Sequence, residues 1–299
     1  MRRSIAAEVA RRPNGDRFGL WGERGSLATM HGKERVIAPL LRRFLGLRVE
    51  IVGGLDTDRF GTFTREVPRP GSQLDAARAK IAAAFAGNPG VRVAVASEGR
   101  FGPHPIVPSA PLGVEIVLLA DRDTGMEVSG QFVDLDAMWT HAVVTDIAAA
   151  RAFAEGVGFP MQGVVVSGCK EQVPCPESGL FKDVLDRADL ERTVGDVIAR
   201  CGAACVETDM RAHRNPCRMR AIARATVTLI RNFRLRCPDW DRPGLVVTER
   251  IPGARCAHCG TPTRVIKAEA STCAGCGHRV ERSVGPPATD PGRCDVCNP

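Results

Sequence analysis

The C-terminal part of the chain contains three Cys-x-x-Cys pairs and the beginning of a fourth. The complete pairs are Cys256/Cys259, Cys273/Cys276 and Cys294/Cys297. The incomplete pair begins at Cys237 and has Trp240 where its second cysteine would stand. Two thiolates separated by two residues bind one side of a tetrahedral metal ion, and two such pairs make a closed four-thiolate site. The spacing between the first two complete pairs predicts that they form a zinc ribbon with a structural Zn²⁺.

The sequence leaves open which pairs share a metal and how many ions bind. Cys237 with Cys294 and Cys297 would give three ligands and leave an opening near Trp240. His258 and His278 lie inside or beside the pairs and are spare ligands. Four more cysteines, at positions 169, 175, 201 and 205, are poorly spaced for metal binding and fit small buried side chains better.

A disulfide framework is the competing interpretation of the cysteines, and it requires an oxidising compartment. The N-terminus has no apolar run long enough for a signal peptide. No segment approaches the ~20 apolar residues of a membrane span. We therefore expect a cytoplasmic protein with reduced thiols, bound zinc and no membrane contact.

Four polar segments lie at the expected ends of helices or strands: 29–34, 56–66, 97–105 and 207–220. In the first, His31 and Lys33 precede a helix, whose free N–H groups can seat a phosphate; a solvated helix start is the alternative. The second combines two aspartates, a glutamate and three threonines around a glycine. That mixture can hold Mg²⁺ through carboxylates, or it can form an Asx-turn loop.

The third and fourth segments follow expected strands, and ligands of open α/β sheets bind outside the carboxyl ends of strands. The third offers Glu98 and His104 in a loop rich in Gly and Pro, with a plain surface loop as the alternative. The fourth offers Asp209, Arg211, His213 and Asn215. Carboxylates beside arginines and a histidine suit an anionic substrate held with a metal or a proton donor. A salt-bridged helix entry is the alternative for the fourth segment.

Helical and strand-like patterns alternate between residues 28 and 236. Helices are expected at 33–45, 72–86, 146–156, 181–200 and 218–236, and strands at 48–52, 91–96, 114–120, 126–133, 163–167 and 204–208. This alternation predicts an α/β fold with a mixed or mostly parallel sheet flanked by helices. Ser72 is expected to cap its helix, with Asp75 as its capping-box partner. Residues 1–27 are expected to be a flexible extension, and 237–299 a Cys-rich zinc-ribbon tail.

The net charge of +7 comes largely from arginine, since the chain has only five lysines. Tyrosine is absent and aromatic residues make up 5% of the chain, which argues against a surface that stacks on bases. Composition therefore gives nucleic-acid binding little support.

Five runs resemble an uncharacterised bacterial family with a domain of unknown function. They are His31–Glu34, Asp56–Thr64, Gly71–Lys80, Ala96–Pro105 and Glu207–Pro216. The resemblance covers about residues 28–299 and supplies no activity. It implies a complete first Cys-x-x-Cys pair, which Trp240 interrupts here.

The order of several motifs is also similar to that of the inosine/xanthosine triphosphate pyrophosphatases. Thr29, His31 and Lys33 resemble the start of that family's pattern, one residue short and with His for Asn. Glu66 and the Arg78–Lys80 helix resemble the second block of that pattern. Val95–Gly99 resembles the third block, and Asp121–Gly125 resembles the fourth. This resemblance implies a Mg²⁺-dependent hydrolase of a non-standard nucleoside triphosphate.

Two functions follow as hypotheses. In the first, the protein hydrolyses a phosphorylated small molecule with Mg²⁺ held by Glu66 and Glu98. The catalytic candidates are Glu98, His104, Asp209 and His213, and the substrate-binding candidates are His31, Lys33, Arg78, Arg211 and Asn215. In the second, the zinc ribbon binds RNA or DNA and the polar segments form a sensor pocket for a small ligand.

Overall fold

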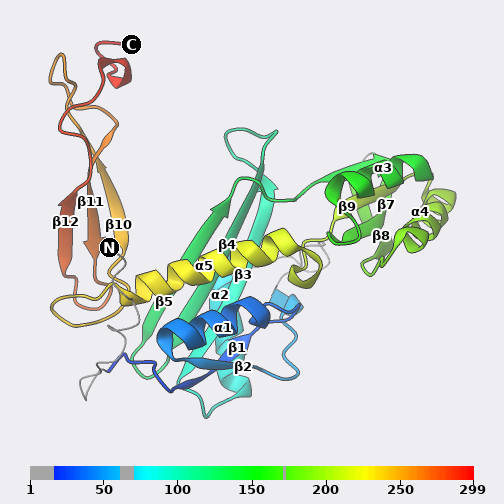
Figure 1. The fold of residues 1–299 in the computed structure, drawn as a ribbon, viewed down its shortest axis with the longest axis horizontal. Helices are drawn as coiled ribbons and strands as arrows, with labels where there is room; N and C mark the ends of the chain where they lie inside the picture. Colours follow the sequence, from blue (N-terminus) through cyan, green and yellow to red (C-terminus); the bar gives the residue numbers. More distant parts are fainter. Residues whose placement is uncertain (1–16, 61–70, 171–172) are drawn as a thin grey trace, which may run out of the picture. The chain divides into compact units, whose positions relative to one another are not determined.

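The computed structural model describes residues 17–60, 71–170 and 173–299 (Figure 1). The chain divides into two compact units. One is Leu20–Ile230, and the other combines Arg231–Pro299 with residues 17–19. In the described ranges, no helix has the length and apolar character needed to cross a membrane.

The larger unit contains a mixed five-stranded sheet in the order β2-β1-β3-β4-β5. Its strands are β1 (Arg24–Ala28), β2 (Arg48–Ile51), β3 (Val93–Pro103), β4 (Pro111–Asp121) and β5 (Met126–Asp134). β1 runs parallel to β2 and β3, whereas β3, β4 and β5 pair antiparallel. The predicted α/β fold with a mixed sheet is therefore confirmed.

Helix α2 (Gln73–Gly87) covers one face of this sheet. Its apolar side packs small residues such as Ala77 and Ala84 against Ala94 and Ala96 of β3 and against Leu118 of β4. The predicted capping box at its start is confirmed, because the Ser72 hydroxyl accepts from the Asp75 N–H and the Asp75 carboxylate accepts from the Ser72 N–H.

Helix α5 (Pro216–Arg234) crosses the strands of the sheet (Figure 1). Gly130 of β5 allows the approach, since a Cβ there would lie 2.0 Å from the Leu229 nitrogen of α5. Gly130 pairs with Val117, the neighbour of Leu118, and successive strand residues face opposite sides. Helices α5 and α2 therefore cover opposite faces, while α1 (Glu34–Leu45) connects β1 to β2.

The same unit contains a four-stranded antiparallel sheet in the order β6-β9-β7-β8. Its elements are β6 (His141–Val144), α3 (Ile147–Val157), β7 (Val164–Lys170), β8 (Val173–Phe181), α4 (Arg187–Cys201) and β9 (Ala204–Thr208). Valines of the strands pack with Leu190 and Val194 of α4 and with alanines of α3. The expected cap at Asp146 is present, and its carboxylate accepts from the Ala149 N–H.

Three boundaries differ from the sequence predictions. β1 begins at Arg24, inside the expected extension, because its backbone pairs with both β2 and β3. The helix expected from residue 181 begins at Arg187, where Asp186 caps it by accepting from the Asp189 N–H. β3 continues to Pro103 through the expected loop, because it pairs with β4 as far as Pro111.

The smaller unit contains a three-stranded antiparallel sheet. Its strands are β10 (Val247–Pro252), β11 (Ile266–Thr272) and β12 (Arg279–Ser283), which lie side by side in Figure 1. Four cysteine turns alternate with these strands, and they are numbered here in chain order: Cys237, Cys256/Cys259, Cys273/Cys276 and Cys294/Cys297. Each strand connects two successive turns, so the direction of the chain reverses from one turn to the next. Short 3-10 turns occur at Asp58–Phe60, Ala212–Arg214 and Pro291–Arg293.

Candidate metal centres and a buried charge cluster

One group of four cysteines has the spacing of a metal site. The sulfurs of Cys256, Cys259, Cys294 and Cys297 all lie within 4.8 Å of one another. Cys256 lies 3.8 Å from Cys297, and Cys259 lies 3.6 Å from Cys294, measured between sulfurs. Four thiolates at such distances match the closed tetrahedral site that Zn²⁺ adopts in structural centres. This cluster can bind a metal such as zinc.

A second group consists of Cys237, Cys273 and Cys276, whose sulfurs also lie within 4.8 Å of one another. The Cys237 and Cys276 sulfurs are 3.5 Å apart. In the described part of the chain, no fourth Cys, His, Asp or Glu side chain joins this group.

The sequence left open which cysteine turns share a metal, and the structure groups them differently from the ribbon that the spacing favoured. The spacing fits Cys256/Cys259 together with Cys273/Cys276, and Cys237 with the last pair was the other grouping considered. In the structure the first turn joins the third and the second joins the fourth. β10, β11 and β12 run antiparallel, so alternate turns fall at the same end of the sheet and consecutive turns fall at opposite ends. Sequence spacing could not show this, because it depends on the strands between the turns.

The thiol pKa values show why the four-cysteine cluster suits a cation. Hydrogen bonding to Thr261, first through its hydroxyl and then through its N–H, lowers the pKa of Cys259 to about 6. Interaction with Cys259 is the main cause that raises the pKa of Cys297 to about 12. Neighbouring sulfurs therefore resist carrying several negative charges together, and a bound metal would remove that repulsion while releasing protons.

The larger unit buries a cluster of charged side chains, here called the buried charge cluster: Lys33, Lys80, Glu98, Glu115 and Arg218. Its first pair joins α2 to β3, with Lys80 Nζ 2.5 Å from Glu98 Oε1 and both side chains more than 90% buried. Removing either charge would leave the other buried and uncompensated, which makes this pair a strong constraint on the fold.

The second pair joins α5 to β4, with Arg218 Nε 2.7 Å from Glu115 Oε1. The guanidinium also stacks 5.0 Å from the ring centroid of Phe101. Gly99 makes room for the pair, since a Cβ there would lie 2.6 Å from both charged groups. Glu115 pairs across the strands with Gly99, the neighbour of Glu98, so Glu98 and Glu115 point to opposite faces of the sheet.

Lys33 lies at the start of α1, next to β3. Its side chain is buried, and its Nζ lies 3.5 Å from the Ser97 carbonyl oxygen. No carboxylate of the described residues forms an ion pair with it. Burial is the main cause that lowers the pKa of Lys33 to about 7, and the charges of Arg218 and Lys80 lower it further. Near neutral pH this amine therefore exchanges readily between its charged and neutral forms.

Two histidines connect the first polar segment to the fourth. The rings of His31 and His213 stack with centroids 5.1 Å apart. His31 has a positive φ of 64°, which turns the chain sharply before α1. Burial, followed by the proximity of His31, lowers the pKa of His213. The predicted residues His31, Lys33, Glu98 and His213 therefore come from segments that meet in this unit.

Other predicted residues of the fourth segment stabilise its own conformation. The buried Asp209 carboxylate accepts from the Arg211 guanidinium at 2.8 Å. Arg211 also pairs with Asp183 at 3.0 Å. Asn215 is fully buried, where its Nδ2 donates to the Asp209 carbonyl and its Oδ1 caps α5 by accepting from the Arg218 N–H.

Two predicted residues lie away from the buried charge cluster. Arg78 is half-exposed on α2 and forms a two-pronged ion pair with Glu127 of β5. His104 follows the end of β3, roughly 20 Å from Glu98 at about 3.3 Å per strand residue. Its Nδ1 closes the β3–β4 connection by accepting from the N–H groups of Ile106 and Val107. Glu66, proposed as a Mg²⁺ ligand, lies outside the described residues.

Three members of the cluster were not among the predicted site residues: Lys80, Glu115 and Arg218. The sequence did contain a sign that Lys80 and Arg218 are buried. Each lies on the same side of its helix as apolar residues, and that side must face the sheet. Glu115 interrupts the apolar run of β4, and a carboxylate among buried strand residues indicates a buried partner.

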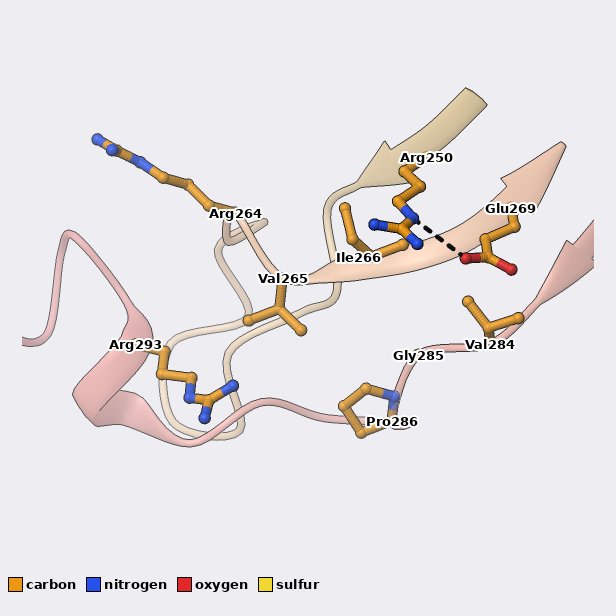
Figure 2. Close-up of a pocket in the computed structure, with 9 residues that line it drawn as sticks. All are labelled: Arg250, Arg264, Val265, Ile266, Glu269, Val284, Gly285, Pro286 and Arg293. Carbon is orange, nitrogen blue, oxygen red and sulfur yellow. Dashed lines mark ion pairs between the residues drawn. The ribbon is translucent and has the colours of Figure 1, made fainter. Parts of the chain in front are cut away.

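A separate pocket lies in the smaller unit, between β11 and the chain that follows β12. Its volume is about 640 Å³, and its lining includes Arg250, Arg293, Val265 and Pro286. Figure 2 shows Arg250 and Arg293 pointing toward the pocket from two sides, with Arg250 paired to Glu269 at 3.3 Å. Figure 2 also shows that Arg264, although it lines the rim, extends away from them.

Comparison with known proteins identifies a family but no activity. None of the curated proteins matches this sequence. A domain of unknown function, DUF6671, matches residues 83–299, which begins later than the expected start near residue 28. The match contains Glu98, Glu115, Arg218 and both cysteine clusters, whereas Lys33 and Lys80 precede it. Since it covers well over half of the sequence, the chain belongs to the family defined by the domain of unknown function DUF6671.

Proposed function

We propose that the Leu20–Ile230 unit binds a small phosphorylated molecule at the buried charge cluster and hydrolyses it. The observation that supports this proposal best is Lys33, a buried amine with a lowered pKa and no carboxylate partner among the described residues. A buried lysine without an ion-pair partner lowers the stability of the fold, and no structural contact among the described residues offsets that cost. Strongly shifted pKa values are concentrated at functional sites.

An anionic ligand would complete the electrostatics of this cluster. Lys80 and Arg218 each already have a carboxylate partner, so Lys33 is the cation that remains for a ligand. A phosphate beside Lys33 would favour the charged amine and raise its pKa. Binding would therefore take up a proton near neutral pH, and the affinity would fall as the pH rises above about 7.

His213 and His31 are the proposed proton-handling groups of this site. Their stacked rings join the chain before α1 to the chain before α5. The lowered pKa of His213 keeps its ring neutral near pH 7, as a general base requires. Asp209, Arg211 and Asn215 would act as positioning residues, because their polar atoms are used to hold this segment.

Mg²⁺ is proposed to arrive with the phosphates of the substrate. Protein sites for Mg²⁺ often use only one or two carboxylates together with substrate phosphates and water. In the described ranges, the groups of three or more potential ligands consist of cysteines alone. Glu98 is the carboxylate we propose for Mg²⁺, and its present partner Lys80 would then interact with substrate.

The four-cysteine cluster is proposed to hold a structural Zn²⁺. Four thiolates fill a tetrahedral ion and leave no position for water or substrate. The metal would then contribute folding free energy to the smaller unit rather than chemistry.

The test is a panel of phosphorylated metabolites, including non-standard nucleoside triphosphates, assayed for phosphate release with Mg²⁺ and Mn²⁺. We expect turnover of at least one compound, a loss of at least 100-fold in kcat/KM for Lys33→Ala, and no change for Lys170→Ala on the exposed end of β7. Equal activity of the Lys33 variant and the parent would refute a role for this cluster. An inactive parent that also fails to bind any panel compound in calorimetry would remove the proposal.

The pocket of the smaller unit supports a second candidate function, binding of a nucleic-acid phosphate. The Arg293 guanidinium makes no ion pair with the described residues and points toward the pocket (Figure 2). Single-stranded RNA and DNA, titrated at several salt concentrations, should bind the parent more tightly than Arg293→Ala. A salt-independent signal, or equal binding by both proteins, would contradict this function.

A further inference from the structure

The first cysteine turn keeps the shape of a metal-binding turn although it lacks its second cysteine. In the two complete turns of this kind, the first cysteine donates its N–H to the carbonyl five residues later: Cys256 to Thr261 at 2.9 Å and Cys273 to His278 at 2.8 Å. Cys237 donates to Arg242 in the same way at 2.9 Å. The position after the missing cysteine, Asp241, has a positive φ of 52°, where the complete turns have glycine.

The side chain at position 240 therefore begins where a fourth thiolate would begin. The indole of Trp240 lies over the Cys273/Cys276 turn, since a Cβ on Gly275 of that turn would lie 1.8 Å from the indole ring. Phe18 packs edge-on against the same ring at 6.1 Å. An indole offers no metal ligand, because its nitrogen is a donor only. The sulfurs of Cys237, Cys273 and Cys276 thus need a fourth ligand from elsewhere to complete a tetrahedron.

His278 has the features of that ligand. Its Nδ1 lies 2.6 Å from the Asp239 carboxylate, and its Nε2 is buried without a hydrogen-bond partner among the described residues. A carboxylate on one ring nitrogen fixes the proton there and leaves the lone pair of the other nitrogen for a metal, which is the usual arrangement of metal-binding histidines. A buried nitrogen without a partner is costly unless a ligand satisfies it.

The position of His278 in its turn places its side chain beside the metal site. His278 corresponds to Thr261 of the four-cysteine cluster, and the Thr261 hydroxyl lies 3.2 Å from the Cys259 sulfur. The N–H of His278 likewise hydrogen-bonds the Cys276 sulfur, which places this residue beside the site. Neither ring nitrogen yet lies within 4.8 Å of all three sulfurs, so ligation requires the imidazole to shift toward them.

We propose that Cys237, Cys273 and Cys276 bind a second Zn²⁺ whose fourth ligand is His278 Nε2, with Asp239 orienting the imidazole. The ligand set is three thiolates and one imidazole, which is an established structural set for zinc. The histidine replaces the cysteine that Trp240 displaced, so the chain keeps two closed sites. This inference is independent of the hydrolase proposed for the larger unit.

The experiment uses the full chain loaded with Zn²⁺ and, in parallel, with ¹¹³Cd²⁺. We expect two ions per chain, and X-ray absorption should show seven sulfur ligands and one nitrogen ligand over the two ions. Two ¹¹³Cd signals are expected, one of which couples to the ring protons of a histidine. His278→Ala should abolish that coupling and weaken the second ion by at least 10-fold in competition with a chelator.

Matched variants separate ligation from a general loss of structure. His258→Ala, in the turn of the four-cysteine cluster, should change neither signal, because four thiolates already close that site. Trp240→Cys in the His278→Ala background should restore tight binding of two ions with eight sulfur ligands. Asp239→Asn should weaken the second ion by about 10-fold while keeping the histidine coupling.

Several outcomes would overturn the proposal. A parent protein that binds a single ion, or a second ion with only sulfur and oxygen ligands, would show that His278 is not a ligand. Unchanged ¹¹³Cd signals and unchanged affinity in His278→Ala would show the same. Failure of Trp240→Cys to restore the second ion would show that the first turn does not direct position 240 at the metal.

Discussion

The lowered pKa of Lys33 predicts a specific dependence of stability on pH. In the unfolded chain this lysine has an ordinary pKa near 10.5, and in the folded protein burial lowers the pKa to about 7. Between these values the unfolded state binds more protons than the folded state, so the free energy of unfolding rises with pH across this window. Below about pH 7 the group is charged in both states, and its penalty is then constant.

The magnitude follows from the two pKa values. Each pKa unit corresponds to about 1.36 kcal/mol, so this group alone should raise the free energy of unfolding by about 4 kcal/mol between pH 7 and pH 10.5. Lys33→Met keeps most of the side-chain volume and removes the charge. We expect the variant to be about 2–4 kcal/mol more stable than the parent at pH 7, with the two proteins becoming nearly equal near pH 10.5.

Urea unfolding of the parent and the variant at several pH values measures this effect. Replacing Trp240 with Phe in both proteins leaves Trp21 and Trp139, so that fluorescence reports the larger unit alone. The matched control is Lys170→Met at the exposed end of β7, which should remain parallel to the parent at every pH. In NMR spectra with ¹³C-labelled lysine, one of five ε-carbon signals should titrate near pH 7 and be absent from Lys33→Met.

Parallel stability curves for the parent and Lys33→Met would refute this reasoning. So would five lysine signals that all titrate near pH 10, since they would show that the Lys33 amine reaches water in the folded protein. Either result would also remove the main support for an anion site at the buried charge cluster.

Three further predictions concern packing, ion pairing and metal. Gly130→Ala should cost about 3 kcal/mol or more in thermal unfolding, since its Cβ would meet the α5 backbone, whereas Gly156→Ala, with open space around it, should not destabilise the protein. Glu98→Gln should cost about 3 kcal/mol by leaving Lys80 buried and unpaired, while changing both residues to apolar side chains should cost much less in the same assay. Cys294→Ser should lose the metal of the four-cysteine cluster and the chemical-shift dispersion of the smaller unit, and Cys201→Ser should retain both.

Local patterns were sufficient to predict many elements of the fold. Ser72 and Asp75 fixed the start of α2 because a capping box needs only residues three positions apart. The polar run from Ser97 was different, because its glycines and prolines resemble a loop while pairing with β4 extends the strand. Long-range strand pairing is absent from a local pattern, so the predicted loop at Glu98 was wrong although Glu98 itself lies in the cluster.

The candidate sites show the same division between local and distant information. The cysteine turns could be recognised from two-residue spacings, but which turns share a metal depended on the number of strands between them. Lys33 could be recognised beside a helix start. Its buried neighbours Glu115 and Arg218 could not be paired in the same way, because they are 103 residues apart in sequence. Their pairing followed only from the placement of α5 on the sheet.

The family match also bears on how the two proposals relate. It contains Glu98, Glu115, Arg218 and all the cysteines of both clusters, but it begins after Lys33 and Lys80. The Glu115–Arg218 pair can therefore form entirely from matched residues, while the Lys80–Glu98 pair and the amine of Lys33 need the preceding segment. The chemistry proposed for the buried charge cluster therefore depends on Lys33 and Lys80, two residues that precede the matched region. The Lys33 variants test that chemistry directly, and the His278 variants leave it untouched.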